Sequence, residues 1–420
     1  MKKKKGHIIA LLLMLLLCGR GVKAQSSHLF DNANLLIEAK GHYGTFYQHH
    51  FEMERFNAHY PAFEFSLYKG TFGEEIWETL YNYPYIGCTF YYSALGNFEE
   101  LGKVYALYPF INYPLLRGEK SMLTFKLGVG IGYITKKFDH IENHYNFAIG
   151  SSHNAAINLS FEYRQQIIPQ LFAVGSFGLT HFSNGATHSP NYGLNTFSGA
   201  LGLAYYLRYP NSSMTPVDRP QHYLFEFDGK KWFSYDVEYC IGYKDVSQIF
   251  GVTNYFLVHD LSAHFLAQFT TCSRAGIALD IVLDKSDAVN LQHNGIDIQS
   301  IRQYQMLRPS LALSYEMTMK RMSYVFDFGY HLNLRADNES IFAKPFINLN
   351  MLTDLSEGQV YQRVMARYQL YEGLFATFSL TSHAGRADFL GIGFGYRFNQ
   401  KYYLNNNAHA KSTVLPPGLD

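Results

Sequence analysis

Apolar and polar residues alternate along most of this chain, in segments of about 10–14 residues that end in turn-forming residues. The clearest segment is 122–134, in which Phe125 and Leu127 stand at odd-numbered positions and Gly128 and Gly130 at even-numbered ones. We call this odd or even position the parity of a residue. Side chains of a β-strand point to opposite faces in turn, so this pattern gives a strand one bulky apolar face and one small face. Long helical patterns are scarce, and we therefore predict an all-β fold.

The alternating segments fall into two sets, on either side of a stretch at 209–222 that is rich in Pro and Ser. In the first set we predict eight strands, with cores at 35–47, 62–69, 85–94, 103–113, 122–134, 155–164, 171–182 and 195–208. In the second set we predict eight or nine, with cores at 232–243, 254–269, 275–283, 307–319, 322–332, 342–351, 360–370, 374–382 and 388–398. Two architectures fit these sets: tandem small barrels of about eight strands each, or one barrel of nearly sixteen strands.

The composition indicates what surrounds these strands. Tyr and Phe number 34 each, and only 16% of the residues are charged. Aromatic girdles at both membrane interfaces are typical of outer-membrane barrels. We therefore predict a transmembrane antiparallel β-barrel of the outer membrane, with a secreted β-sandwich as the alternative. The formal net charge of +1 gives no indication of a nucleic-acid partner.

The N-terminus predicts export. Residues 1–24 combine a positive stretch, a short apolar core and a small-residue site near Ala24, which is typical of a cleaved signal peptide. We divide the remainder into a first barrel half, a linker, a second barrel half and a disordered tail, at 25–208, 209–222, 223–400 and 401–420.

The two halves resemble each other near their ends. Leu171-Phe172-Ala173 precedes His181, and Leu374-Phe375-Ala376 similarly precedes His383. The second copy lacks the Ser-Asn pair that follows the first histidine region. We therefore predict that the second half is a degenerate repeat of the first, which has lost any site that the first half carries.

The most informative polar group stands where the segment 171–182 meets a loop. His181 and Ser183 are two residues apart, so in a strand they share a face with the apolar residues before them. Asn195 has the parity of the bulky residues of the next strand. In two adjacent antiparallel strands these three side chains are expected to lie together on the lipid-facing side. The first strand of such barrels starts in the periplasm, so the loop after the seventh strand is expected at the outer surface.

The residues around this group carry a family resemblance. Thr180-His181-Phe182-Ser183-Asn184-Gly185, followed by Pro190-Asn191-Tyr192-Gly193-Leu194-Asn195, resembles the signature of the lipid A 3-O-deacylases (PagL type, acyloxyacyl hydrolase-like). The resemblance covers roughly residues 30–208. It implies a serine esterase in an outer-membrane barrel, which needs no cofactor and acts on lipid A of lipopolysaccharide.

The resemblance also implies roles for single residues. Ser183 would be the nucleophile and His181 the general base. In the family an acidic residue orients the histidine, whereas the matching position here is Asn195, which can accept a hydrogen bond but carries no charge. Asn184, Gly185 and Asn191 match the motif as oxyanion donors or supports of the loop.

Other readings compete with this one. A non-catalytic outer-membrane barrel, porin-like or structural, could retain a remnant site, and a secreted β-rich binding protein is a third possibility. The pairs His49-His50 and His140/His144 lack the context of a metal site, so we expect no metal. After cleavage three cysteines remain, Cys88, Cys240 and Cys272, of which the last two could form a disulfide.

Overall fold

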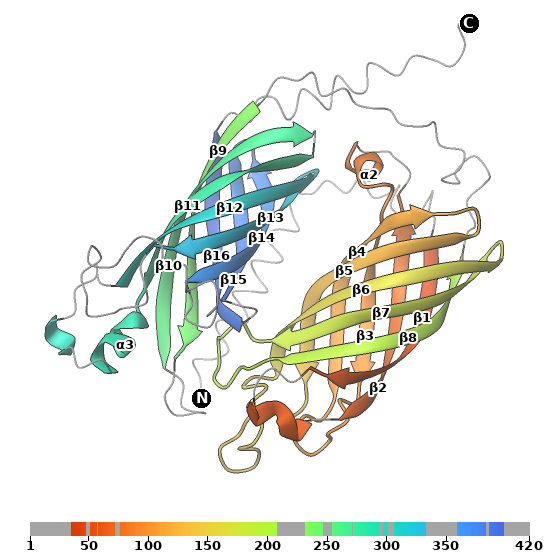
Figure 1. The fold of residues 1–420 in the computed structure, drawn as a ribbon, viewed down its shortest axis with the longest axis horizontal. Helices are drawn as coiled ribbons and strands as arrows, with labels where there is room; N and C mark the ends of the chain where they lie inside the picture. Colours follow the sequence, from red (N-terminus) through yellow and green to blue (C-terminus); the bar gives the residue numbers. More distant parts are fainter. Residues whose placement is uncertain are drawn as a thin grey trace, which may run out of the picture.

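The computed structural model describes residues 35–47, 51–56, 58–71, 76–207, 232–246, 254–270, 272–293, 297–300, 306–332, 359–383 and 386–398. Within these residues the chain forms two closed antiparallel barrels (Figure 1). The all-β transmembrane fold is therefore confirmed, and of the two architectures the pair of small barrels is the correct one. The predicted signal peptide, linker, tail and strand at 342–351 lie outside the described residues.

The first barrel closes through hydrogen bonds between its first and last strands. Its strands are β1 (Leu35–Phe46), β2 (His59–Gly70), β3 (Tyr85–Ser93), β4 (Val104–Arg117), β5 (Ser121–Ile134), β6 (His153–Ile168), β7 (Leu171–Ser183) and β8 (Leu194–Tyr206). The closing pair is β1 with β8, in register from Leu36↔Tyr206 to Phe46↔Thr196. A 3-10 helix, η1 (Phe51–Phe56), follows β1, and a short helix, α2 (Ile76–Leu80), precedes β3.

The second barrel repeats this topology. Its strands are β9 (Trp232–Asp245), β10 (Tyr255–Thr270), β11 (Ser273–Asp284), β12 (Leu307–Met319), β13 (Met322–His331), β14 (Val360–Tyr371), β15 (Leu374–His383) and β16 (Arg386–Phe398). β16 pairs with β9, from Leu390↔Tyr243 to Phe398↔Tyr235. The helix α3 (Asp287–His293) and the 3-10 helix η4 (Ile298–Ser300) follow β11.

The strands turn their apolar side chains outward, the reverse of a water-soluble protein. On β2, Phe63, Phe65 and Leu67 are 46%, 44% and 42% exposed, whereas Glu64 between them is 1% exposed. A soluble sandwich buries the apolar set instead, because water solvates the polar one. An outer surface of this kind is stable in lipid, where the closed barrel also satisfies every strand hydrogen bond.

The interior of the first barrel is filled with paired charges. Lys40 Nζ lies 3.1 Å from both Glu38 Oε1 and Glu64 Oε1 and also contacts Glu162. Arg164 Nη2 lies 2.6 Å from Glu38 Oε2 and 3.0 Å from Glu162 Oε2. Packed apolar side chains lie above and below this network. The described lumen is therefore a packed core.

The second lumen is filled by arginines and carboxylates. Arg363 contacts Asp260, Asp280 and Asp327 at 2.8, 2.7 and 2.6 Å. Arg367 pairs in the same way with Asp236 and Glu238, and Arg397 pairs with Asp236 and Glu316. Removing one partner of such a buried group leaves an uncompensated charge, so these networks bind the strands together.

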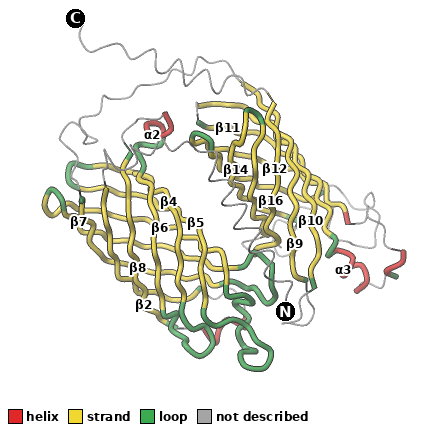
Figure 2. The backbone as a smooth tube through the Cα atoms, turned by 180° about the vertical axis from the view of Figure 1, so that it is seen from behind, coloured by secondary structure: helices red, strands yellow, loops and turns green. Residues whose placement is uncertain are grey.

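The two barrels lie side by side (Figures 1 and 2). The β7–β8 loop (184–193) of the first barrel reaches the second, where Asp245 N donates a 2.8 Å hydrogen bond to Ala186 O. Cys88, Cys240 and Cys272 are free thiols, so the disulfide that we considered between the last two is not formed. Among the described helices, none is long and apolar enough to span a membrane.

Candidate active site

The outer face of β7 carries His181 at the end of an apolar row. Its register partner on β8 is Asn195, and the neighbouring Thr180 and Phe182 are buried on the opposite side, in the lumen. His181 Nδ1 lies 2.6 Å from Asn195 Oδ1. An amide oxygen only accepts, so Nδ1 carries the hydrogen, and in the neutral ring the lone pair then lies on Nε2. The contact therefore fixes the imidazole in the tautomer that a general base needs at Nε2.

Ser183 is the last residue of β7 and has the parity of His181. It is 4% exposed, whereas Phe177 on the same face is 61% exposed. The cover over Ser183 includes Gly193, whose φ is +79°. A Cβ added to Gly193 would lie 3.0 Å from His181 Cε1 and 3.6 Å from Ser183 Cβ, so this glycine backbone adjoins both side chains. A larger residue here would displace the imidazole.

Two asparagines hold the β7–β8 loop in shape. Asn184 N donates to Asn191 Oδ1 at 3.0 Å, and Asn184 Nδ2 donates to His188 O at 2.9 Å. Thr187 Oγ1 donates to Asn184 O at 2.9 Å. Both the backbone and the side-chain amide of Asn184 are thus engaged within the loop. Of the two roles expected for these asparagines, the contacts favour loop support.

Gly185 turns the chain directly after this pair. Its φ is +65°, in the left-handed region that glycine adopts without a steric penalty. A Cβ added there would lie 2.4 Å from Cγ of Leu390, in β16 of the second barrel. The position therefore requires glycine for two reasons, its backbone conformation and its close approach to the other barrel.

The histidine pairs that we set aside as metal ligands belong to the first half of the chain. His140 and His144 are exposed in the β5–β6 loop (135–152), where the His144 ring packs on Tyr145 with centroids 3.9 Å apart. His49 and His50 lie outside the described residues. In the described part of the chain, the group with metal-like spacing is Glu38, Glu64 and Glu162, whose carboxylates already surround the Lys40 ammonium.

Comparisons with known proteins match both barrels. Residues 62–204 match the family described as lipid A 3-O-deacylase (PagL), and residues 233–400 match the C-terminal domain described for acyloxyacyl hydrolase (PagL_C). The chain belongs to the PagL family. The second match covers a half for which the sequence motifs indicated no family. Membership implies an outer-membrane barrel of a Gram-negative bacterium and a deacylase of lipid A.

Solved structures of outer-membrane proteins resemble parts of this chain. The outer-membrane enzyme PagL is 15% identical over 39% of this chain and 97% of its own, with a TM-score of 0.27. Neisserial surface protein A is 7% identical over 41% and 97%, with a TM-score of 0.28. A mutant porin of Rhodopseudomonas blastica is 6% identical over 87% and 100%, at 0.16. At TM-scores this low, the three structures support no conclusion about the fold or function of this chain. No curated protein matches the sequence significantly.

A groove follows the lipid-facing side of this PagL-family barrel towards the site. It offers about 780 Å³ of space, and its floor includes Gly41, Gly175 and Gly199. A Cβ added to Gly41 would meet nothing within 4 Å, so missing side chains create the groove. Its walls are apolar, among them Phe177, which precedes His181 by four residues on the same face of β7.

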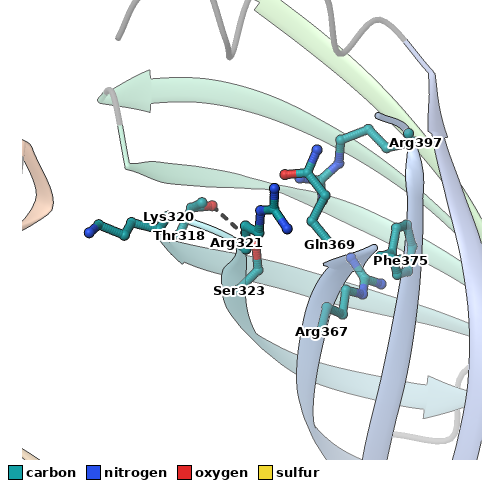
Figure 3. A pocket seen from close by; sticks show the side chains of 9 residues that line it. Thr318, Lys320, Arg321, Ser323, Arg367, Gln369, Phe375 and Arg397 are labelled. Carbon is teal, nitrogen blue, oxygen red and sulfur yellow. Dashed lines mark hydrogen bonds between the residues drawn. The ribbon is translucent and has the colours of Figure 1, made fainter. Parts of the chain in front are cut away.

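A second hollow lies in the other barrel, among the β12–β13 and β14–β15 turns (Figure 3). It holds about 20 Å³ of space, enough for roughly one water molecule. Its deeper arginines, Arg367 and Arg397, are committed to Asp236, Glu238 and Glu316. Neither its size nor its chemistry suits a lipid substrate.

Three contributors to the site were missed by sequence reasoning. The first is Gly193, which covers the site. The second is the β5–β6 loop, in which Ala148 O accepts a 2.9 Å hydrogen bond from Gly193 N. The third is Asp245 of the second barrel, whose carboxylate accepts a hydrogen bond from Ser189 N. The glycine stood in the recognised motif, but its role depends on its φ. The other two come from distant segments, and their spacing along the chain carries no signal.

Proposed function

We propose that the first barrel is a serine esterase that removes an ester-linked acyl chain from lipid A. Family membership supplies the substrate class. The observation that carries the chemical part is the contact of His181 Nδ1 with Asn195 Oδ1, on the face that also bears Ser183. That contact leaves His181 Nε2 as the proton acceptor.

We infer a two-step reaction for these residues. Ser183 Oγ attacks the ester carbonyl carbon, and its proton passes to His181 Nε2. The tetrahedral intermediate then expels the sugar oxygen, which takes the proton from the imidazolium. Water, deprotonated by His181, hydrolyses the acyl-serine and restores the enzyme. Asn195 orients the imidazole throughout, but its neutral amide does not offset the imidazolium charge.

The lipid-facing groove supports an acyl substrate. The site lies near the loop end of β7, and the groove begins four residues towards the middle of the strand, at Phe177. His181 is four residues and Ser183 six residues beyond Phe177, or about 13 and 20 Å along the strand. An acyl chain whose ester reaches Ser183 can extend towards the groove while the sugar stays near the outer surface.

Mass spectrometry of lipid A tests the proposal. Cells that express the wild type should lose an acyl chain from lipid A, and cells that express Ser183→Ala should not. Ser382→Ala, which removes a hydroxyl near the end of β15 in the second barrel, is the matched control and should behave as the wild type. Acyl loss that persists in Ser183→Ala refutes the serine mechanism, and intact lipid A in the wild type favours the non-catalytic barrel.

A further inference from the structure

One residue of the second barrel holds the loop that covers the candidate site. Asp245 lies at the end of β9 and is 5% exposed. Its Oδ2 accepts from Ser189 N at 2.9 Å, and its carbonyl oxygen accepts from Ser189 Oγ at 3.2 Å. Its backbone N donates to Ala186 O at 2.8 Å. Three hydrogen bonds thus join Asp245 to the β7–β8 loop.

The same carboxylate is anchored within its own barrel. Asp245 Oδ1 accepts from Asn254 N at 2.7 Å, which ties it to the start of β10. Val246 N donates to Asn254 O at 3.0 Å and closes the connection. The two carboxylate oxygens therefore serve different barrels, one each. A carboxylate supplies this pair of acceptors, whereas a neutral amide supplies one.

Two further contacts widen this interface. Tyr255 Oη and His188 Nε2 lie 3.2 Å apart, and the two rings meet edge-on with centroids 5.9 Å apart. Gly185 packs closely on Leu390 of β16. On its other side, the loop is held by the first barrel, since Tyr192 N donates to Phe147 O at 3.3 Å. The loop is thus clamped between the two barrels.

The clamp connects to Ser183 through a short path. Ser189 is fixed by Asp245, and its neighbour His188 accepts from Asn184 Nδ2. Asn184 directly follows Ser183. A displacement of Ser189 would therefore be passed through His188 and Asn184 to the candidate nucleophile. In catalysis, a misplacement of about 1 Å can cost on the order of 10²-fold in rate.

We propose that the second barrel positions the catalytic loop of the first, and that Asp245 is the positioning residue. The inference rests on the proposed esterase function of Ser183. It gives the second barrel a role in the reaction of the first. The second barrel therefore supports the catalytic loop from within the same chain.

Steady-state deacylation of purified lipopolysaccharide by the full-length protein tests this role. Asp245→Ala should lower kcat by about 10- to 100-fold, with KM within about twofold. Asp245→Asn, which keeps one acceptor, should fall between Ala and the wild type. Tyr255→Phe should lower kcat a few-fold, whereas Tyr330→Phe should not. Tyr330 is the matched control because its hydroxyl donates to Gln359 Oε1 within the second barrel at 2.8 Å.

Hydrogen exchange at the amides of 184–193 gives a readout independent of activity. Exchange should speed up in Asp245→Ala and stay unchanged in Tyr330→Phe. If Asp245→Ala and Tyr255→Phe keep the wild-type kcat while Ser183→Ala is inactive, the positioning role is wrong and the esterase stands. If the wild type releases no acyl chain, the esterase proposal fails, and equal exchange in wild type and Asp245→Ala then overturns the clamp as well.

Discussion

The two barrels each carry a histidine near the end of their seventh strand, and the two side chains face opposite ways. His181 stands on the lipid-facing side and contacts Asn195. His383 turns into the lumen, where its Nε2 lies 3.2 Å from Asp388 Oδ2 and its Nδ1 donates to Val360 O at 3.0 Å. The first histidine lies on the lipid-facing side, whereas the second belongs to a buried polar network.

One residue of spacing accounts for the difference. His181 follows Leu171 by ten positions, and His383 follows Leu374 by nine. Because strand side chains alternate with a period of two, an odd change moves a side chain to the other face. The β15–β16 pairing also shifts its register between Thr381 and Ser382. Similar residues in two repeats therefore do similar chemistry only when their parity agrees.

The largest expected effect separates the two histidines directly. His181→Ala should lower the deacylation rate by about 10³-fold or more, because the general base is lost. His383→Ala should leave the rate within about twofold, since its ring lies in the other lumen. Acyl release from purified lipopolysaccharide measures both, and heat-modifiable gel mobility checks that each variant folds. Equal losses of deacylation rate in the two variants would contradict the distinction between the two histidines.

The second prediction compares a lumen residue with a rim residue. Arg363→Met leaves Asp260, Asp280 and Asp327 without their shared guanidinium, and we expect it to cost about 3–5 kcal/mol of stability. Arg321→Met, at an exposed turn, should change stability by less than about 0.5 kcal/mol. Urea unfolding followed by gel mobility measures the difference. An unchanged midpoint for Arg363→Met would contradict the structural role of the network.

The third prediction concerns Asn195, which stands where the family has an acidic residue. Asn195→Glu should raise the deacylation rate by about tenfold or more, because a carboxylate offsets the charge that develops on His181. The reverse change in a serine protease triad costs about 10⁴-fold. Asn195→Gln, which has the same length and no charge, is the control and should give no gain. A fall or no change in Asn195→Glu would count against the orienting role.

The smallest expected effect concerns the groove. Gly199→Phe should fill part of it and lower the rate of acyl release about fivefold, more for longer chains, through steric exclusion of a methylene or two. A Cβ at Gly199 meets only Ser176 O, at 4.0 Å, so the barrel should tolerate the change. Ala275→Phe adds the same ring to the exposed side of β11, in the second barrel, as a control. Equal rates across the three proteins would show that the groove does not hold the substrate.

The sequence predicted the strands well because their signal is local. Alternation located the described strands of both barrels to within a few residues, and it already gave the segment of β5 one bulky apolar face and one small face. The further strand predicted at 342–351 lies outside the described residues. The same count placed His181 and Asn195 side by side, and the structure pairs them; the grouping with Ser183 and the catalytic roles stay a prediction. Parity depends only on neighbours along the chain, so it needs no tertiary information.

Only the tertiary structure decided how each barrel closes, where the two barrels contact each other and which loops cover the candidate site. Whether β8 returns to β1 or continues into β9 depends on hydrogen bonds between strands far apart in sequence, and both arrangements satisfy the same alternation. The approach of Asp245 to Ser189 and the lumenal position of His383 follow from how the closed barrels meet and register. Such contacts join segments whose separation along the sequence is not fixed, so the alternation of apolar and polar residues does not predict them.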